Sequence, residues 1–397
     1  LSNRVQKVKP SATIAVSDKA KELKSQGIQI VSMGSGEPDF DTPTNIQKAA
    51  IKAIGNGETR YTAADGTPEL KKAICEKFKR ENGLDYSLNE VMVSCGGKQV
   101  FYNLCQAILN TGDEVIIPSP YWVSYPDMAI LADATPVFIE TGIDQDFKIS
   151  PEQLEASITA KTKLLVLNSP SNPTGSVYSK SEIEALGSVL EKYPHVLTIS
   201  DDIYEHIRWG DDDFVNIAMA CPNLKDRVII LNGVSKAYAM TGWRVGFSYS
   251  SVEVAQKFTA LQSQITSNTA TPSQVGALEA FRNVEAASVA IAEMGVAFRR
   301  RRNLVITLMD QLLPGVPYIR PEGAFYLYFR VDGLFGADES DATAWCSQLL
   351  QEHGVALVPG AAFGDDRWVR LSFAAADALI EEAFERIVTM VRTGAAA

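Results

Sequence analysis

The sequence predicts an α/β protein, with a large domain built on a mostly parallel sheet of about seven strands and a smaller α/β domain after it. Three observations lead to this prediction. Short apolar runs alternate with amphipathic segments through the first two thirds of the chain. Several runs are apolar at nearly every position, as strands buried on both faces are. After about residue 270, long helical patterns replace this alternation.

The apolar runs are the expected strands of the large sheet, at 91–94, 114–118, 136–140, 163–168, 196–200, 227–232 and 246–250. Between them, residues 98–109 and 180–192 have the apolar stripe of an amphipathic helix. Thr67, Pro68 and Glu69 form a helix start, with a cap, a proline at the first position and an acid in the first turn.

The chain beyond residue 270 is expected to form mainly a second α/β unit. Its predicted elements are helices at 271–282, 285–312 and 377–393, and strands near 324–330, 355–358 and 367–373. We expect the first 40 residues or so to pack with this unit, since they precede the main sheet. The predicted division is an N-terminal arm and part of the small domain at 1–45, a large domain at 46–285 and a small domain at 286–397.

The composition argues against several classes of function. The 397 residues include 37 Lys and Arg against 48 Asp and Glu, a net charge of −11, which disfavours binding to nucleic acid or anionic lipid. No apolar run reaches the roughly 18 residues of a membrane helix, and the start of the chain lacks a signal-peptide pattern. Five scattered cysteines without a CxxC indicate buried thiols in a reducing, cytoplasmic compartment. Three histidines without ligand spacing predict no metal site.

The run Arg299–Arg302 is the one strongly basic segment. Successive residues of a helix point about 100° apart, so the four side chains cannot form a single patch. We therefore expect a solvated, salt-bridged helix face and not a nucleic-acid site.

A lysine directly follows one of the buried runs. Lys236 lies on the loop after 227–232, and α/β proteins bind ligands at the loops that follow the carboxyl ends of their strands. A desolvated lysine loses proton affinity and can form a Schiff base. Ser235 and Arg244 flank it and can hold a phosphate, with the guanidinium as a two-pronged clamp.

Three more clusters lie at strand ends. Asn172 belongs to an Asn-Pro-Thr-Gly turn, and Asp201 ends a buried run, where a carboxylate is costly unless it meets a cation. Gly97 and Lys98 belong to a Gly-Gly junction between a strand and a helix, whose free N–H groups suit a phosphate. Neither of the two common nucleotide-binding motifs, GxxxxGK[ST] and GxGxxG, is present. Each cluster taken alone is also compatible with an ordinary loop.

Taken together, the motifs give a specific resemblance. In order along the chain they are Lys9-Pro10-Ser11-Ala12-Thr13, Gly36-Glu37-Pro38-Asp39-Phe40, Gly96-Gly97-Lys98-Gln99, Pro120-Tyr121-Trp122-Val123-Ser124-Tyr125, Asn172-Pro173-Thr174-Gly175, Ser200-Asp201-Asp202-Ile203-Tyr204, Ser235-Lys236-Ala237-Tyr238, Gly242-Trp243-Arg244-Val245-Gly246 and Val369-Arg370-Leu371-Ser372. With them the whole chain resembles the class I (fold-type I) pyridoxal-phosphate aminotransferases, most closely the bacterial aspartate/prephenate branch. One departure is Asp202, where the family often has Glu.

The resemblance implies a role for each cofactor residue. Lys236 would be the Schiff-base lysine and would carry protons during the reaction, and Asp201 would pair with the pyridine nitrogen of pyridoxal 5′-phosphate. Tyr204 and Asn172 would bond the phenolic oxygen, and Trp122 would stack on the ring.

The phosphate and substrate residues are implied in the same way. The expected phosphate site consists of Gly97, Lys98, Ser235 and Arg244. Tyr61 resembles the tyrosine that a neighbouring subunit contributes, which implies a homodimer with shared active sites. Arg370 would grip the substrate α-carboxylate next to Gly36, Trp122 and Asn172. Lys9 and Lys98 match the lysines that hold a side-chain carboxylate in this branch.

The expected activity is therefore amino transfer between L-aspartate or L-glutamate and the 2-oxo acids oxaloacetate and 2-oxoglutarate. Prephenate carries a second carboxylate as well, so conversion of prephenate to arogenate fits the same lysines. Two alternatives stay open at this point: a transaminase for aromatic or alanine donors, and a pyridoxal-phosphate lyase on the same fold. The same electron-accepting cofactor serves all of them.

Overall fold

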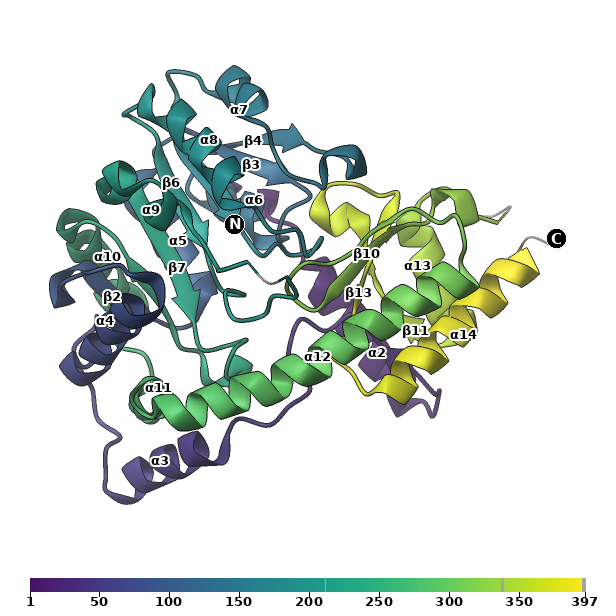
Figure 1. Ribbon diagram of the computed structural model, residues 1–397, viewed down its shortest axis with the longest axis horizontal. Helices are drawn as coiled ribbons and strands as arrows, with labels where there is room; N and C mark the ends of the chain where they lie inside the picture. The colour runs from purple at the N-terminus through teal and green to yellow at the C-terminus, as the bar shows by residue number, and fades with distance from the viewer. Residues whose placement is uncertain (211, 337–338, 395–397) are drawn as a thin grey trace.

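The computed structural model describes residues 1–210, 212–336 and 339–394. A large sheet with helices on both faces occupies one part of the molecule, and a smaller group of strands and helices occupies the other (Figure 1). The long helix α12 (Val284–Leu312) runs from α11 (Thr271–Arg282) along one side of the molecule toward the smaller group (Figure 1). The division of the chain at about residues 45 and 285 stays a prediction.

The large sheet has seven strands in the order β2-β8-β7-β6-β5-β3-β4. Their bounds are β2 Val91–Ser94, β3 Glu114–Ser119, β4 Thr135–Glu140, β5 Thr162–Asn168, β6 Leu197–Asp201, β7 Val228–Gly233 and β8 Gly246–Tyr249. All pairs are parallel except those of β8, which is antiparallel to β2 and β7. Each of the seven predicted runs coincides with one of these strands, so the predicted mostly parallel sheet is confirmed.

Parallel pairing brings three strand ends to one edge of the sheet. Asn168, the last residue of β5, lies opposite Asp201, the last residue of β6, and Asp201 lies opposite Leu231 of β7. Strands β2 and β7 are buried along their whole length and β6 over all but its first residue, because helices cover both faces. Polar residues that end such strands therefore meet at this edge.

Helices on the two faces of the sheet close two apolar cores. One core contains Ile74 and Phe78 of α4, and the other contains Phe101 and Leu104 of α5. Helix α4 begins as predicted, with the Thr67 hydroxyl accepting a hydrogen bond from the Leu70 N–H at 3.3 Å. The helices of this part are α3 Thr44–Gly55, α4 Pro68–Asn82, α5 Gly97–Ile108, α6 Ser124–Leu131, α7 Pro151–Ser157, α8 Lys180–Glu191, α9 Ile217–Ala220 and α10 Val252–Ile265.

The smaller group contains an antiparallel sheet in the order β12-β13-β10-β9, and a parallel pair of β1 and β11. The pair joins the N-terminal segment to the C-terminal part, with Val31 opposite Val355, as expected. Helix α13 was not among the predicted elements. The bounds are β1 Val31–Ser32, β9 Tyr318–Ile319, β10 Tyr326–Arg330, β11 Val355–Ala356, β12 Val358–Pro359, β13 Trp368–Ser372, α2 Ala12–Ser25, α13 Ala342–His353 and α14 Asp377–Gly394.

Short helical turns complete the chain: α1 Asn3–Lys7 and 3-10 turns at Leu88–Glu90, Ile143–Gln145, Pro222–Arg227, Thr241–Trp243, Asp332–Leu334 and Gly360–Phe363. Of the helices in the described ranges, none has both the length and the apolar character needed to cross a membrane. All five cysteines are free thiols. Contrary to expectation only three are buried, since Cys75 in α4 and Cys95 directly after β2 are partly exposed.

The four arginines of α12 form the predicted solvated, salt-bridged face only in part: Arg299 and Arg300 are exposed, whereas Arg301 is buried. Arg301 is only 7% exposed, and its two terminal nitrogens donate to both carboxylate oxygens of Asp39 at 2.7 and 2.8 Å. Arg300 forms a pair with Asp377, while the other two bond to backbone carbonyls of distant segments. The helix thus anchors several segments at once, because its successive side chains point in different directions.

Replacing Arg301 by Met should destabilise the protein by about 2–4 kcal/mol, because Asp39 then lacks its partner in a largely buried pair. Arg300→Met is the matched control. Its pair with Asp377 is exposed, so the loss should stay below about 1 kcal/mol. Thermal unfolding of the cofactor-free protein at one concentration measures both. Equal losses would contradict the assigned anchoring role of Arg301.

Candidate active site

A cavity of about 370 Å³ lies at the carboxyl edge of the large sheet, where the smaller group of strands faces it. Eleven of the thirteen predicted site residues line it: Gly36, Gly97, Lys98, Trp122, Asn172, Asp201, Tyr204, Ser235, Lys236, Arg244 and Arg370. The other two do not. Lys9 is exposed on the segment before α2, and Tyr61 is 89% exposed on the loop before α4.

Further residues line the cavity that sequence reasoning did not single out. The start of α2 contributes Ser11, Thr13 and Ile14, and the main sheet side contributes Tyr125 and Asn168. Ser11 and Thr13 lie in the motif Lys9–Thr13, one of the motifs that carry the resemblance, but the resemblance implied no role for these two residues. Tyr326, on β10, had no signal, because it stands in an aromatic strand of the usual buried kind.

Lys236 reaches into the cavity from the loop after β7. Its ammonium donates a hydrogen bond to the Gly36 carbonyl. Burial, together with the positive charge of Arg370, lowers the pKa of Lys236 to about 8. At pH 7 about one tenth of the amine is therefore neutral, far more than for an ordinary lysine, and the neutral form is the one that acts as a nucleophile.

Asp201 lies at the end of β6 with both carboxylate oxygens engaged. Oδ2 accepts from the Tyr125 hydroxyl at 2.5 Å, and Oδ1 accepts from the Ile203 N–H at 3.3 Å. Burial raises the pKa of Asp201 to about 6, and the Tyr125 hydrogen bond works against this rise. Tyr125 therefore helps to keep Asp201 ionised, which a buried partner for a cationic ring nitrogen requires.

Tyr204 and Arg370 meet at Tyr326. The hydroxyls of Tyr204 and Tyr326 are 2.7 Å apart, and burial keeps the pKa of Tyr204 well above its ordinary value. Arg370 stacks on the Tyr326 ring at 4.4 Å and donates to Asn172 Oδ1 and the Gly34 carbonyl, both at 2.8 Å. Its Nε is buried without a partner among the described residues. An arriving carboxylate would satisfy it.

The junction between β2 and α5 forms a cradle for an anion. An ideal Cβ on Gly96 would lie 2.5 Å from Arg244 Nη2, so only glycine lets the guanidinium come this close. Arg244 donates from Nη1 to the Thr241 carbonyl at 2.8 Å and from Nη2 to the Cys95 carbonyl at 3.3 Å. The free N–H groups at the start of α5 add to this positive site. The residues present thus fit a phosphate next to an amine, an acid and a buried phenol, as pyridoxal phosphate requires.

The neutral fraction of Lys236 can be measured directly. In the cofactor-free protein its modification by an amine-selective reagent should rise with pH with a midpoint of about 8, because only the unprotonated amine reacts. Peptide mass analysis follows the site. Arg370→Gln should move the midpoint upward, since the Arg370 charge disfavours the ammonium form. A midpoint at the ordinary lysine value of about 10.4 would contradict the assigned burial effect.

Three comparisons with known proteins agree with this geometry. A family model described as aminotransferase class I and II matches residues 28–387. Aspartate/prephenate aminotransferase of Cereibacter sphaeroides is 50% identical over 393 residues, covering 98% of this chain and 97% of its own. The protein of the same name from Nitrosomonas europaea is 49% identical over 398 residues, with 98% and 99% covered.

Solved structures give the same result. The aspartate aminotransferase of Thermus thermophilus with maleate has a TM-score of 0.93 and 42% identity, and the match covers 98% of this chain and 99% of that one. The aspartate aminotransferase of Rhizobium meliloti has a TM-score of 0.92 and 41% identity, with 99% and 98% covered. The predicted fold and cofactor are thereby confirmed: the chain belongs to the aminotransferase class I and II family and is an aminotransferase that uses pyridoxal phosphate.

Proposed function

We propose that the protein transfers the amino group between L-aspartate or L-glutamate and the 2-oxo acids oxaloacetate and 2-oxoglutarate, and that prephenate is a further acceptor, giving arogenate. The relatives' names support this substrate class. One observation on this chain carries it: the cavity presents two separate cations, Arg370 and Lys98, to a substrate that would have two carboxylates.

Both cations lack full compensation. Burial lowers the pKa of Arg370, and its Nε has no partner in the described part of the chain. Partial desolvation, followed by the Arg244 charge, lowers the pKa of Lys98, whose ammonium lies 5.3 Å from the centre of the Trp122 ring. A lowered pKa means that an anion stabilises the charge when it arrives. A substrate with a carboxylate at each end satisfies both groups, whereas an apolar side chain leaves Lys98 unsatisfied.

The cofactor supplies an aldehyde that bonds to amines and a ring that accepts electrons. We propose that Lys236 supplies the amine and moves a proton at Nζ, which its low pKa favours. Asp201 would hold a proton on the ring nitrogen. Tyr204 and Asn172 would bond the ring oxygen, and Trp122 would cover the ring face. Gly97, Lys98, Ser235 and Arg244 would bind the phosphate, and Arg370 with Gly36 the substrate α-carboxylate.

Lys98→Met tests the substrate proposal. Loss of one charge-assisted hydrogen bond should lower kcat/KM for L-aspartate and L-glutamate by roughly 10–100-fold. Because Lys98 is also proposed to contact the cofactor phosphate, part of the loss should be common to all donors. The loss for L-aspartate and L-glutamate should exceed the loss for L-phenylalanine and L-alanine by roughly tenfold, because only the first two carry a second carboxylate. The amino-donor half-reaction is followed by cofactor absorbance, and oxaloacetate, 2-oxoglutarate or prephenate is then added to reverse it. The same series with Lys9→Met tests whether Lys9 takes part.

Other results point to the alternatives. If kcat/KM falls equally for all four donors, Lys98 does not bind a second carboxylate. The alternative, an aminotransferase for aromatic or alanine donors, would then be favoured. Release of ammonia or of a side-chain fragment, in place of a 2-oxo acid, would indicate lyase chemistry. If prephenate fails to reverse the half-reaction, prephenate is not an acceptor, and the rest of the proposal stands.

We propose in addition that the protein is a homodimer with shared active sites. Exposed apolar side chains support a subunit interface. They are Ile14 at the cavity, Ile51 and Ile54 on α3, and Tyr61 nearby in the chain. An exposed set of this kind is typical of a protein–protein contact. Tyr61 is proposed to reach the site of the partner subunit. The five free thiols support a reducing compartment, and we propose that the enzyme works in the cytoplasm.

Mixing two impaired variants tests the sharing. Lys236→Ala should be inactive, and Tyr61→Phe should be impaired. Heterodimers made by refolding a mixture should regain activity, since one of their two sites then combines an intact Lys236 with an intact Tyr61. Sedimentation should give twice the 43.2 kDa chain mass. No gain above the activity that the Tyr61→Phe subunits supply would place Tyr61 in its own subunit's site or outside the reaction.

A further inference from the structure

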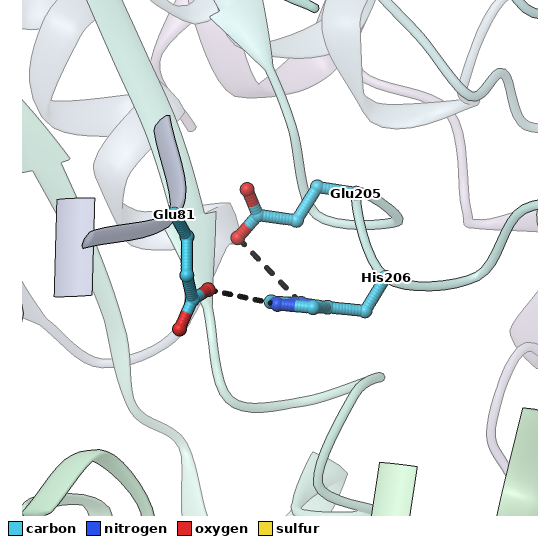
Figure 2. Close-up of side chains that lie close together, drawn as sticks. All are labelled: Glu81, Glu205 and His206. Carbon is cyan, nitrogen blue, oxygen red and sulfur yellow. Dashed lines mark hydrogen bonds and ion pairs between the residues drawn. The ribbon is translucent and has the colours of Figure 1, made fainter. Parts of the chain in front are cut away.

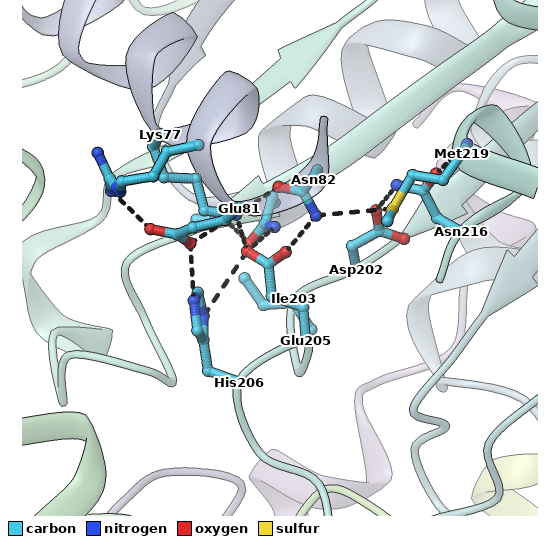
Figure 3. A network of polar contacts seen from close by, with 12 residues as sticks. Lys77, Glu81, Asn82, Asp202, Ile203, Glu205, His206, Asn216 and Met219 are labelled. Carbon is cyan, nitrogen blue, oxygen red and sulfur yellow. Dashed lines mark hydrogen bonds and ion pairs between the residues drawn. The ribbon is translucent and has the colours of Figure 1, made fainter. Parts of the chain in front are cut away.

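A second cluster of charged groups lies behind the loop that carries Asp201 and Tyr204. Figure 3 shows it between helix α4 and the loop after β6. We call it the Glu205 cluster, and it consists of Lys77, Glu81, Asn82, Glu205, His206 and Asn232. None of its six members lines the cavity, so the roles proposed above leave it unused.

A buried ion pair forms the centre of the cluster. The Lys77 side chain is 1% exposed, and its ammonium donates to Glu205 Oε1 and, at 3.0 Å, to Asn82 Oδ1. Glu81 Oε2 lies 3.4 Å from the same ammonium. Burial alone would raise the pKa of Glu205, but the charges of Lys77 and His206, together with hydrogen bonds from Lys77 and Asn82, lower it below the ordinary value. Glu205 is thus a carboxylate with a buried counter-ion.

The Glu205 cluster is poorly suited to bind a metal ion. Glu81, Glu205 and His206 offer ligand atoms within 4.8 Å of one another, with His206 between the two carboxylates (Figure 2). His206 Nε2 lies 3.0 Å from Glu81 Oε2, and Nδ1 lies 3.6 Å from Glu205 Oε1. The Lys77 ammonium already lies against the same two carboxylates. A divalent ion would have to share the carboxylates of Glu81 and Glu205 with the buried Lys77 ammonium. The cluster therefore fits a structural role better than metal binding.

Glu205 joins two elements of the active site, the loop after β6 and the end of β7. It follows Tyr204 directly, and its backbone N–H donates to the Asp202 carbonyl at 2.9 Å, which closes the turn after Asp201. Oε1 also accepts from Asn232 Nδ2 at 2.8 Å. Asn232 lies near the end of β7, four residues before Lys236.

The other carboxylate oxygen connects to α4. Oε2 accepts from Asn82 Nδ2 at 3.1 Å, so each oxygen of Glu205 has a fixed direction. Together with Lys77, these bonds hold one short loop against a strand end and a helix end. A carboxylate that accepts from three buried donors has a single low-energy orientation, and the backbone that carries it is restrained as well.

We propose that Glu205, with its partner Lys77, is a positioning residue for the amino transfer. Its carboxylate fixes the loop that presents Asp201 and Tyr204 against the end of β7 that presents Lys236. The proposal rests on the functions proposed above for these three residues. Glu205 acts through them and touches neither substrate nor cofactor.

The experiment compares four variants. Glu205→Gln removes the charge and keeps the shape, and Glu81 remains near Lys77 as a counter-ion, which favours folding. Asn232→Ala removes only the link to β7 and is the milder second variant. Lys79→Met is the matched control on the same helix, since its pair with Asp85 at 3.2 Å is exposed. Tyr204→Phe marks the effect of losing the phenol itself.

Three readouts separate positioning from stability. Hydrogen exchange of the amides at 202–207, in the cofactor-free protein, reports how firmly the loop is held. The pH midpoint of the visible absorbance change, in the cofactor-loaded protein, reports the surroundings of Lys236. Steady-state kinetics separate kcat from KM. Thermal unfolding accompanies all variants.

For Glu205→Gln we expect faster exchange across 202–207, a midpoint shifted by at least about 0.5 pH unit, and kcat lowered roughly 10–100-fold with KM within about twofold, as small displacements of catalytic groups cause. Asn232→Ala should change each readout less, in the same direction. Lys79→Met should change none of them.

A lowered unfolding temperature for Glu205→Gln with unchanged exchange, midpoint and kcat would overturn the proposal, because Glu205 would then be purely structural. If Tyr204→Phe shifts the midpoint and Glu205→Gln does not, the inference about Glu205 fails alone. If Tyr204→Phe leaves the midpoint unchanged, the function proposed for Tyr204 is wrong instead, and the exchange of 202–207 still decides the positioning.

Discussion

The parallel pairing of β5, β6 and β7 is the constraint on which the site depends. It places the ends of three strands at one edge, with Asn168 opposite Asp201 and the Lys236 loop beside them. Each strand is largely or wholly buried, so a polar residue within it would need a partner in the core. At the edge the chain leaves the sheet, and an amine, an acid and a phenol can face a shared cavity. The positions of Asp201 and Lys236 are therefore set mainly by where their strands end.

The same constraint explains how much the sequence could predict. Runs of apolar residues identified all seven strands of the large sheet, because burial on both faces leaves a composition signal that is independent of partners. Eleven predicted site residues came together, since most lie at strand ends or helix starts whose position follows from the topology. The resemblance supplied the chemical roles, which periodicity could not give. Lys98 and Asn172, for instance, would alone have remained ordinary loop residues.

What the sequence missed depends on contacts between distant segments. Tyr125 bonds Asp201 across 76 residues, and Tyr326 meets Tyr204 across 122. Tyr125 lies in the motif Pro120–Tyr125, but nothing in that motif pairs it with Asp201, and no local pattern distinguishes Tyr326 from a core aromatic. The approach of α2 to the cavity is of the same kind, because it follows from the pairing of β1 with β11. Arg301 was expected to be exposed for a related reason: its partner Asp39 lies 262 residues away in the chain.

The loop after β6 shows how the fold accommodates several acids in one short segment. Asp201 bonds Tyr125 beside the cavity, whereas Asp202 and Glu205 take partners outside its lining. Asp202 accepts from Ser200 at 2.7 Å and from Asn216 at 2.6 Å. A longer side chain would need these donors farther away. Each carboxylate thus has its own donors, and this separation leaves Asp201 at the cavity, where we propose that it pairs with the cofactor.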